Sequence, residues 1–164
     1  MKTLLLIRHA KAQRAEARLS DHDRTLEERG RRDAVEMGRR LSRRGVKPDL
    51  IVSSSALRAS ATARLIAAEI GYPAEAVLED RRLYASSVTK MLYLIQEFDD
   101  KADCVALVGH NPEMSELSQR FSNDLPEMAT CAVAELDFDC ARWTEIGAGA
   151  ASRTLFDVPK KGQD

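Results

Sequence analysis

Three separate stretches of the sequence place arginine or histidine close behind apolar residues. Arg8 and His9 follow the apolar run Leu4–Ile7. His110 ends a second apolar run, and Arg58 follows a third. Guanidinium groups donate paired hydrogen bonds that match phosphate oxygens, and an imidazole can attack phosphorus or stabilise developing charge. Residues of these types therefore predict a pocket for a phosphoryl group.

The two histidines can divide the chemistry of such a pocket. We expect His9 to attack phosphorus as a neutral imidazole. His110, kept protonated by the bound anion, would stabilise the charge of the transition state. The arginine and histidine side chains of this pocket already supply the positive charge that a cation provides in metal-dependent phosphatases. We therefore expect neither a metal site nor a cofactor.

Apolar patterning predicts the elements that hold these residues. Continuous apolar runs are typical of strands covered on both faces, and apolar residues at the helical period predict helices. We expect strands at residues 3–7, 49–52, 104–108, 132–136 and 152–156, the last two joined by a turn at 147–150. We expect helices at residues 25–45, from 53 to about 70, at 87–98, and from 111 onward. The alternation predicts a single three-layer α/β/α domain over residues 1–164, with a mostly parallel central sheet flanked by helices.

Capping signals suggest where these helices begin. The segment Thr25–Glu28 has the spacing of a capping box, and the Ser53–Ser55 run supplies N-cap candidates. Asn111 and Pro112 are expected as the cap and the first residue of the helix that follows His110. Helix N-termini at the carboxyl ends of the strands, where open α/β sheets bind ligands, would add N–H donors to the anion site.

Composition limits the classes of partner. The 164 residues carry 25 Lys plus Arg against 26 Asp plus Glu, a formal net charge of −1. This balance provides no global field for nucleic acid or an anionic membrane, so we expect neither as a partner. Four strongly apolar residues before Arg8 are too few for a signal-peptide core or a spanning helix, which predicts a cytoplasmic protein.

Three segments of the sequence resemble the histidine phosphatase superfamily, whose fold is phosphoglycerate mutase-like. Leu6–Ala10 is similar to the family's Arg-His-Gly signature, which contains the nucleophilic histidine. Ser53–Ala59 resembles the segment of the second arginine, and Val108–Pro112 resembles the segment of the second histidine. Ser20–Leu26 and Arg82–Tyr84 are similar to the SixA subgroup of phosphohistidine phosphatases.

The resemblance implies a role for each matching residue. His9 corresponds to the nucleophile, Arg8 and Arg58 to the phosphate clamps, and His110 to the partner that orients and neutralises the transferring group. The implied reaction removes a phosphoryl group from phosphohistidine in a protein through a covalent intermediate on His9. A phosphatase of small phosphorylated molecules is the alternative within the same superfamily. A mutase and a phosphate-binding module without turnover are weaker alternatives.

The sequence departs from the family pattern at three positions. Ala10 replaces the usual glycine beside the nucleophile, Ser55 replaces a common proline, and Ala61 stands where a glutamine is frequent. Ala10 could narrow the pocket or tighten its backbone. The absence of a long insertion between Arg58 and His110 predicts an open, shallow site.

No residue matches the acid that protonates an alcohol leaving group in larger members of the family. Glu79, Asp80, Asp21 and Asp23 are all candidates, and Asp21 is also a candidate for substrate binding. This pattern favours a substrate with a good leaving group, such as phosphohistidine. We interpret His22 as an exposed loop residue without a catalytic function, and its acidic neighbours as solvated groups rather than metal ligands.

Overall fold

A mixed β-sheet forms the centre of the molecule. The computed structural model describes residues 1–147 and 151–159. Within these residues, six strands are arranged in the order β3-β2-β4-β1-β5-β6. Their bounds are β1 Lys2–Arg8, β2 Leu50–Ser54, β3 Leu78–Asp80, β4 Cys104–Gly109, β5 Val133–Phe138 and β6 Arg153–Asp157. The pairs β1–β4, β2–β4 and β2–β3 are parallel, whereas β5 runs antiparallel to both β1 and β6.

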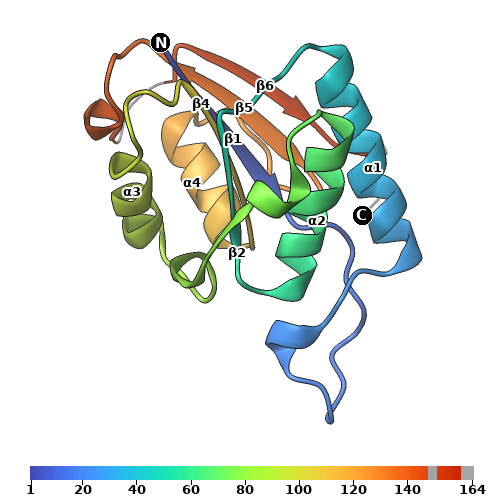
Figure 1. The fold of residues 1–164 in the computed structure, drawn as a ribbon. Helices are drawn as coiled ribbons and strands as arrows, with labels where there is room; N and C mark the ends of the chain where they lie inside the picture. Colours follow the sequence, from blue (N-terminus) through green and yellow to red (C-terminus); the bar gives the residue numbers. More distant parts are fainter. Residues whose placement is uncertain (148–150, 160–164) are drawn as a thin grey trace.

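Helices cover both faces of this sheet. Figure 1 shows α1 and α2 on one face and α3 and α4 on the other. The α-helices are α1 Glu28–Arg43, α2 Leu57–Glu69, α3 Val88–Gln96 and α4 Glu113–Phe121. Short 3₁₀ helices are η1 Asp21–Asp23, η2 Ala74–Ala76, η3 Arg81–Leu83 and η4 Trp143–Glu145. The prediction of a mostly parallel sheet between two helical layers is therefore confirmed.

Strand β1 separates two hydrophobic cores. Successive side chains of a strand point to opposite faces of the sheet. Leu4 and Leu6 pack in the core beneath α3 and α4, and Leu5 and Ile7 pack in the core beneath α1 and α2. All four are at most 1% exposed, so β1 is held from both sides and its last residues lie in a fixed position.

The predicted capping box at the start of α1 is wrong. The helix begins at Glu28, its N-cap is Glu27, and no side chain caps it. The Thr25 hydroxyl instead donates a hydrogen bond to Oε1 of Gln13 at 3.1 Å. Leu26 pairs with Ala12 in an isolated β-bridge. This pairing competes with helix formation in the residues just before Glu28.

The predicted serine caps of α2 are also wrong. Ser53 and Ser54 are the last two residues of β2, and the N-cap of α2 is Ala56. Because β2 lies between β3 and β4, ladder pairing extends the strand through both serines. The hydroxyl of Ser54 consequently lies at the end of the strand, where it accepts from the N–H of Ala56 at 3.2 Å, whereas that of Ser53 donates to the carbonyl of Ser54.

Helix α4 begins one residue later than predicted. Pro112 occupies the N-cap position, and the Asn111–Pro112 peptide bond is cis. Oδ1 of Asn111 still accepts a hydrogen bond from the N–H of Ser115 at 3.1 Å, so the asparagine does satisfy a free donor of the helix.

Other boundaries agree with the sequence patterns. Gly45 and Gly71 lie at the predicted ends of the first two helices, near residues 45 and 70, and have φ values of +74° and +77°, in the left-handed region that favours glycine. The short edge strand β3 was not predicted. The turn expected at 147–150 lies largely outside the described residues. Among the helices of the described residues, none is long and apolar enough to cross a membrane.

Candidate active site

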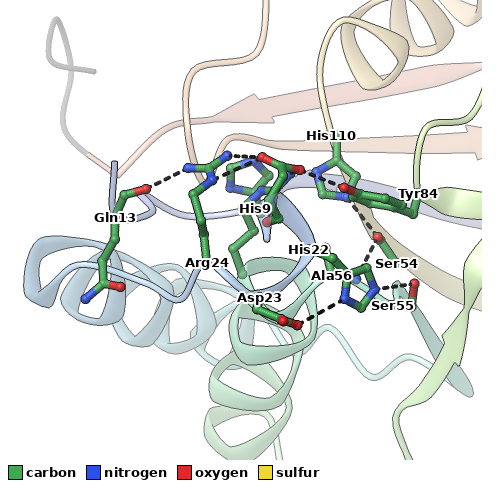
Figure 2. Close-up of polar contacts among 12 residues, drawn as sticks. His9, Gln13, His22, Asp23, Arg24, Ser54, Ser55, Ala56, Tyr84 and His110 are labelled. Carbon is green, nitrogen blue, oxygen red and sulfur yellow. Dashed lines mark hydrogen bonds and ion pairs between the residues drawn. The ribbon is translucent and has the colours of Figure 1, made fainter. Parts of the chain in front are cut away.

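Neighbouring strands bring the two predicted histidines together. β1 and β4 are parallel, with Arg8 in register with Gly109, so His9 and His110 follow at the same edge of the sheet. The N–H of His9 donates to the carbonyl of Gly109 at 2.9 Å. The centroids of the two imidazole rings are 5.2 Å apart, and Figure 2 shows both rings at the centre of the site.

The hydrogen bond of His9 defines its tautomer. Nδ1 lies 2.7 Å from the carbonyl oxygen of Ala10, and a carbonyl can only accept, so Nδ1 carries the proton. Nε2 therefore holds the free electron pair. The pKa of His9 is lowered to about 3, mainly by burial; the bond to Ala10 opposes this shift, and the positive charges of Arg58 and Arg8 add to it. His9 is thus a neutral imidazole near pH 7.

His110 is also neutral when no anion is bound. Nε2 lies 2.8 Å from Oγ of Ser54, and Nδ1 is buried with no hydrogen-bond partner among the described residues. Burial, followed by the charge of Arg58, lowers the pKa of His110 to about 4. A bound phosphate would raise this pKa, because an opposite charge favours the protonated form. The protonated His110 expected from the sequence would therefore depend on the substrate.

Arg58 enters the site from the first turn of α2. Its side chain is 7% exposed. Nη1 donates to the backbone carbonyl of Asp21 at 2.7 Å, and Nη2 donates to Oδ2 of Asp21 at 3.0 Å. Nε is buried with no hydrogen-bond partner among the described residues. Asp21 thus holds one side of the guanidinium group and leaves Nε–H for another acceptor.

Arg8 is the last residue of β1, next to His9 in the chain. Its Nη1 donates to the backbone carbonyl of Met128 at 2.9 Å, which anchors the side chain to the segment before β5. The positive charge of Arg8 contributes to the lowered pKa values of both His9 and His110. The structure therefore brings together all four residues predicted from the motifs.

Asp21 connects three side chains at the rim of the site. Its Oδ2 accepts hydrogen bonds from the Tyr84 hydroxyl at 2.8 Å and from Arg58, and its Oδ1 accepts from Nη2 of Arg24 at 2.9 Å. The bond from Tyr84, followed by those from Arg24 and Arg58, holds the pKa of Asp21 well below its usual range. The carboxylate stays ionised, which argues against Asp21 as the general acid.

The other candidate acids are also engaged with basic side chains. Glu79 pairs with Arg64 at 2.7 Å, Asp80 pairs with Arg82 at 2.8 Å, and Asp23 lies 3.5 Å from Nδ1 of His22. The hydrogen bond from Arg82 lowers the pKa of Asp80. None of these contacts favours a protonated carboxyl group. Within residues 1–147 and 151–159, no group of three or more acidic, histidine or cysteine side chains could hold a metal ion.

The structure places His22 at the rim of the site rather than in an exposed loop. Its Nε2 lies 3.0 Å from Oγ of Ser55, and its side chain is 37% exposed. The ring of Tyr84 makes edge contacts with both His22 and His110, at centroid distances of 5.0 and 5.8 Å. Sequence reasoning missed Tyr84 and Ser54 as neighbours of the histidines. The Ser53–Ser55 run is the available signal, but its local spacing indicates a helix cap rather than a site residue.

Ala10 does not narrow the pocket. Its side chain is fully buried in the core beneath α1 and α2. Its N–H donates to Oγ1 of Thr62 at 2.9 Å, and its carbonyl accepts from His9. The residue therefore fixes the backbone beside His9, which agrees with the second effect expected from the sequence.

Comparisons with known proteins agree with this geometry. The sequence model of the histidine phosphatase superfamily (branch 1) matches residues 4–84. The solved structure of SixA from Agrobacterium tumefaciens is 30% identical, with a TM-score of 0.77 over 84% of this chain and 92% of that chain. SixA from Nakamurella multipartitia is 26% identical, with a TM-score of 0.80 over 96% of each chain. An uncharacterised protein of Mycobacterium tuberculosis is 29% identical over 94% of this chain and 100% of its own length.

Proposed function

The chain belongs to the histidine phosphatase superfamily and is therefore a phosphatase, and we propose that its substrate is phosphohistidine in a protein. The two SixA proteins to which it is similar carry the assignment phosphohistidine phosphatase. One observation carries the proposal: a neutral His9 lies beside two buried nitrogens, Nε of Arg58 and Nδ1 of His110, that have no partner among the described residues. Buried polar groups without partners are costly, and phosphate oxygens would satisfy them.

The proposed reaction proceeds through a phosphorylated enzyme. Nε2 of His9 attacks phosphorus, and a new N–P bond forms as the N–P bond of the substrate breaks. The substrate's imidazole leaves in its neutral form, provided that its other nitrogen carries a proton. Water then attacks the phosphorus of the intermediate, which releases inorganic phosphate and restores neutral His9. Arg8 and Arg58 hold the phosphate oxygens, and His110 neutralises the developing charge.

The state of the carboxylates supports a substrate with a good leaving group. An alkoxide needs a proton from a general acid as it departs, whereas an imidazole protonated on its far nitrogen does not. Asp21 is ionised and engaged by Arg58, Arg24 and Tyr84. Hydrolysis of a phosphoramidate bond therefore suits this site better than hydrolysis of an alkyl phosphate ester.

A comparison of substrates tests the proposed specificity. The purified chain would be presented with a histidine-phosphorylated protein or peptide and with a panel of phosphorylated metabolites, and kcat/KM would be measured for each. We expect the phosphohistidine substrate to have the highest value. A higher kcat/KM for a metabolite would instead establish the small-molecule phosphatase.

Trapping the intermediate tests the mechanism separately. After rapid quenching, the phosphoryl group should be found on His9 as a phosphoramidate that survives alkali and is lost in acid. Because arginine and histidine side chains supply the positive charge, chelator should leave activity intact. An acid-stable label on Ser53, Ser54 or Ser55, or activity that a divalent metal restores after chelation, would overturn the mechanism.

A further inference from the structure

A basic depression lies beside the candidate active site. It has a volume of about 500 Å³ and is lined by Arg81, Arg82, Tyr84, Lys90 and Tyr93. Tyr84 belongs to both regions, because its hydroxyl binds Asp21 and its ring contacts His110. A molecule that occupied the depression would therefore lie next to the reacting groups.

Two positive side chains of this basic depression have no carboxylate partner among the described residues. Arg82 is paired with both Asp80 and Glu97, at 2.8 and 2.9 Å. The charge of Arg82 is therefore already balanced by carboxylates of this chain. Arg81 and Lys90 are exposed, and their side chains form no hydrogen bond or ion pair among the described residues.

The position of Lys90 is unfavourable for the isolated fold. It lies in the first turn of α3, which contains no acidic residue. The positive end of the helix dipole disfavours a cation there. An anionic partner at the basic depression would relieve this repulsion and would pair with Arg81 at the same time.

Tyr93 adds an apolar surface to these charges. It is 63% exposed on α3, although tyrosine usually buries much of its ring. Tyrosine and arginine are both enriched at surfaces that bind other proteins, where the ring packs against the partner. The charges of Arg81 and Lys90 would select acidic side chains.

We propose that the basic depression binds an acidic polypeptide segment that flanks the phosphorylated side chain of the substrate. The inference rests on the proposed function, since it requires a polypeptide substrate. With the phosphoryl group at His9, the flanking chain passes Tyr84 and places its carboxylates beside Arg81 and Lys90. The pocket around His9 would then select the phosphoryl group, and the basic depression would select the sequence around it.

Synthetic phosphohistidine peptides test this inference. Three peptides would differ only in their flanking residues, which are glutamate, glutamine or lysine, and phosphoramidate would serve as the small substrate. Two exposed ion pairs predict a kcat/KM about 5-fold higher for the acidic peptide than for the neutral one, and lower still for the basic peptide. The double variant Arg81→Glu, Lys90→Glu should lose or reverse this order and should hydrolyse phosphoramidate at the parent rate.

The double variant Lys47→Glu, Lys101→Glu provides the matched control. Both lysines are exposed, their side chains form no ion pair among the described residues, and they precede β2 and β4 at the opposite end of the sheet. This control variant changes the net charge by the same amount as Arg81→Glu, Lys90→Glu, and it should keep the order of kcat/KM values that the parent chain shows for the three peptides. Equal kcat/KM for all three peptides, or the same loss of order in both double variants, would overturn the proposed role of the basic depression. Either result would leave the proposed phosphohistidine phosphatase activity standing. Hydrolysis of metabolites but of no phosphohistidine peptide would overturn the proposed function and the inference with it.

Discussion

Arginine has contrasting surroundings in α1 and in α2. Arg32 on α1 is 69% exposed and lies 3.4 Å from Glu28, one helical turn away. Arg58 on α2 is 7% exposed and binds Asp21 across 37 residues of sequence. Water screens the first pair, so it contributes little, whereas the guanidinium group of the second pair is buried and only its carboxylate partner reaches solvent. The pocket, rather than the number of arginines, therefore produces the anion site.

The strongest test of the pocket is the loss of its nucleophile. His9→Ala should reduce kcat by on the order of 10⁴-fold or more, because no covalent intermediate can form. Phosphate affinity should remain in part, since both arginines are still present. Steady-state kinetics and phosphate binding would measure the two effects, and near-normal turnover in this variant would disprove the covalent mechanism.

Substitution of the buried arginine should have the next largest effect. Arg58→Ala removes one charge-stabilising donor and should cost roughly 2 to 4 kcal/mol of transition-state stabilisation. Arg58→Lys should restore only part of kcat/KM, because lysine keeps the charge but loses the planar fork. Full activity of the lysine variant would show that paired hydrogen bonds are unimportant at this position.

Burial of the histidines should make stability depend on pH. The pKa of His9 is lowered to about 3 in the fold, below its ordinary value of 6.5, so the unfolded chain binds more protons between these values. Stability should therefore be full above about pH 7 and fall as pH decreases. At pH 5 His9 alone should cost roughly 2 kcal/mol of unfolding free energy.

Chemical denaturation at pH 7.5 and pH 5 would measure this dependence. The difference between the two pH values should be smaller in His9→Ala than in the parent chain by the contribution of that histidine. An unchanged difference would mean that His9 is not neutralised by burial. The exposed arginines of α1 should contribute nothing to the dependence, since they stay charged across this range.

Asp21 offers a smaller test of the same pocket. Asp21→Asn keeps a side chain that can accept a hydrogen bond but removes the charge opposite Arg58. Because the Asp21 side chain is 49% exposed, solvent screening limits the expected loss to about 1 kcal/mol, which is several-fold in kcat/KM. A positioning function predicts the same loss for phosphohistidine and for alkyl esters, whereas a much larger loss for the esters would identify Asp21 as a general acid.

The exposed arginine completes the comparison with the smallest effect. Arg32→Ala should change the unfolding free energy by no more than about 0.5 kcal/mol and leave kcat/KM unchanged, because its pair with Glu28 is solvated. Thermal denaturation and steady-state kinetics would measure both quantities. A loss of activity in Arg32→Ala would show that the charged surface of α1 takes part in substrate binding.

The positions of His9 and His110 could be predicted because they depend on short-range patterns. Apolar runs identify β1 and β4 as central strands, and parallel strands deliver the residues at their carboxyl ends to one edge. Gly45 and Gly71 likewise end their helices for a local reason, the left-handed backbone that glycine accepts.

The two wrong predictions of helix caps arose where a long-range contact competed with a local sequence signal. Thr25 could cap a helix, but Leu26 pairs with Ala12. Ser54 could cap α2, but sheet pairing places it in β2, where it contacts His110 across 56 residues of sequence. Capping signals describe only a few neighbouring residues, and backbone pairing with a distant strand can override them.

Sequence patterns were enough to predict the alternation of strands and helices, the cores on both faces of β1, and the four nitrogen-bearing side chains at the strand ends. How those side chains are held depends on contacts between distant parts of the chain. Asp21 meets Tyr84 across 63 residues and Arg58 across 37, and burial keeps His9 neutral. Periodicity is a property of neighbouring residues, whereas hydrogen-bond partners and pKa values depend on which distant groups exclude water from the same site.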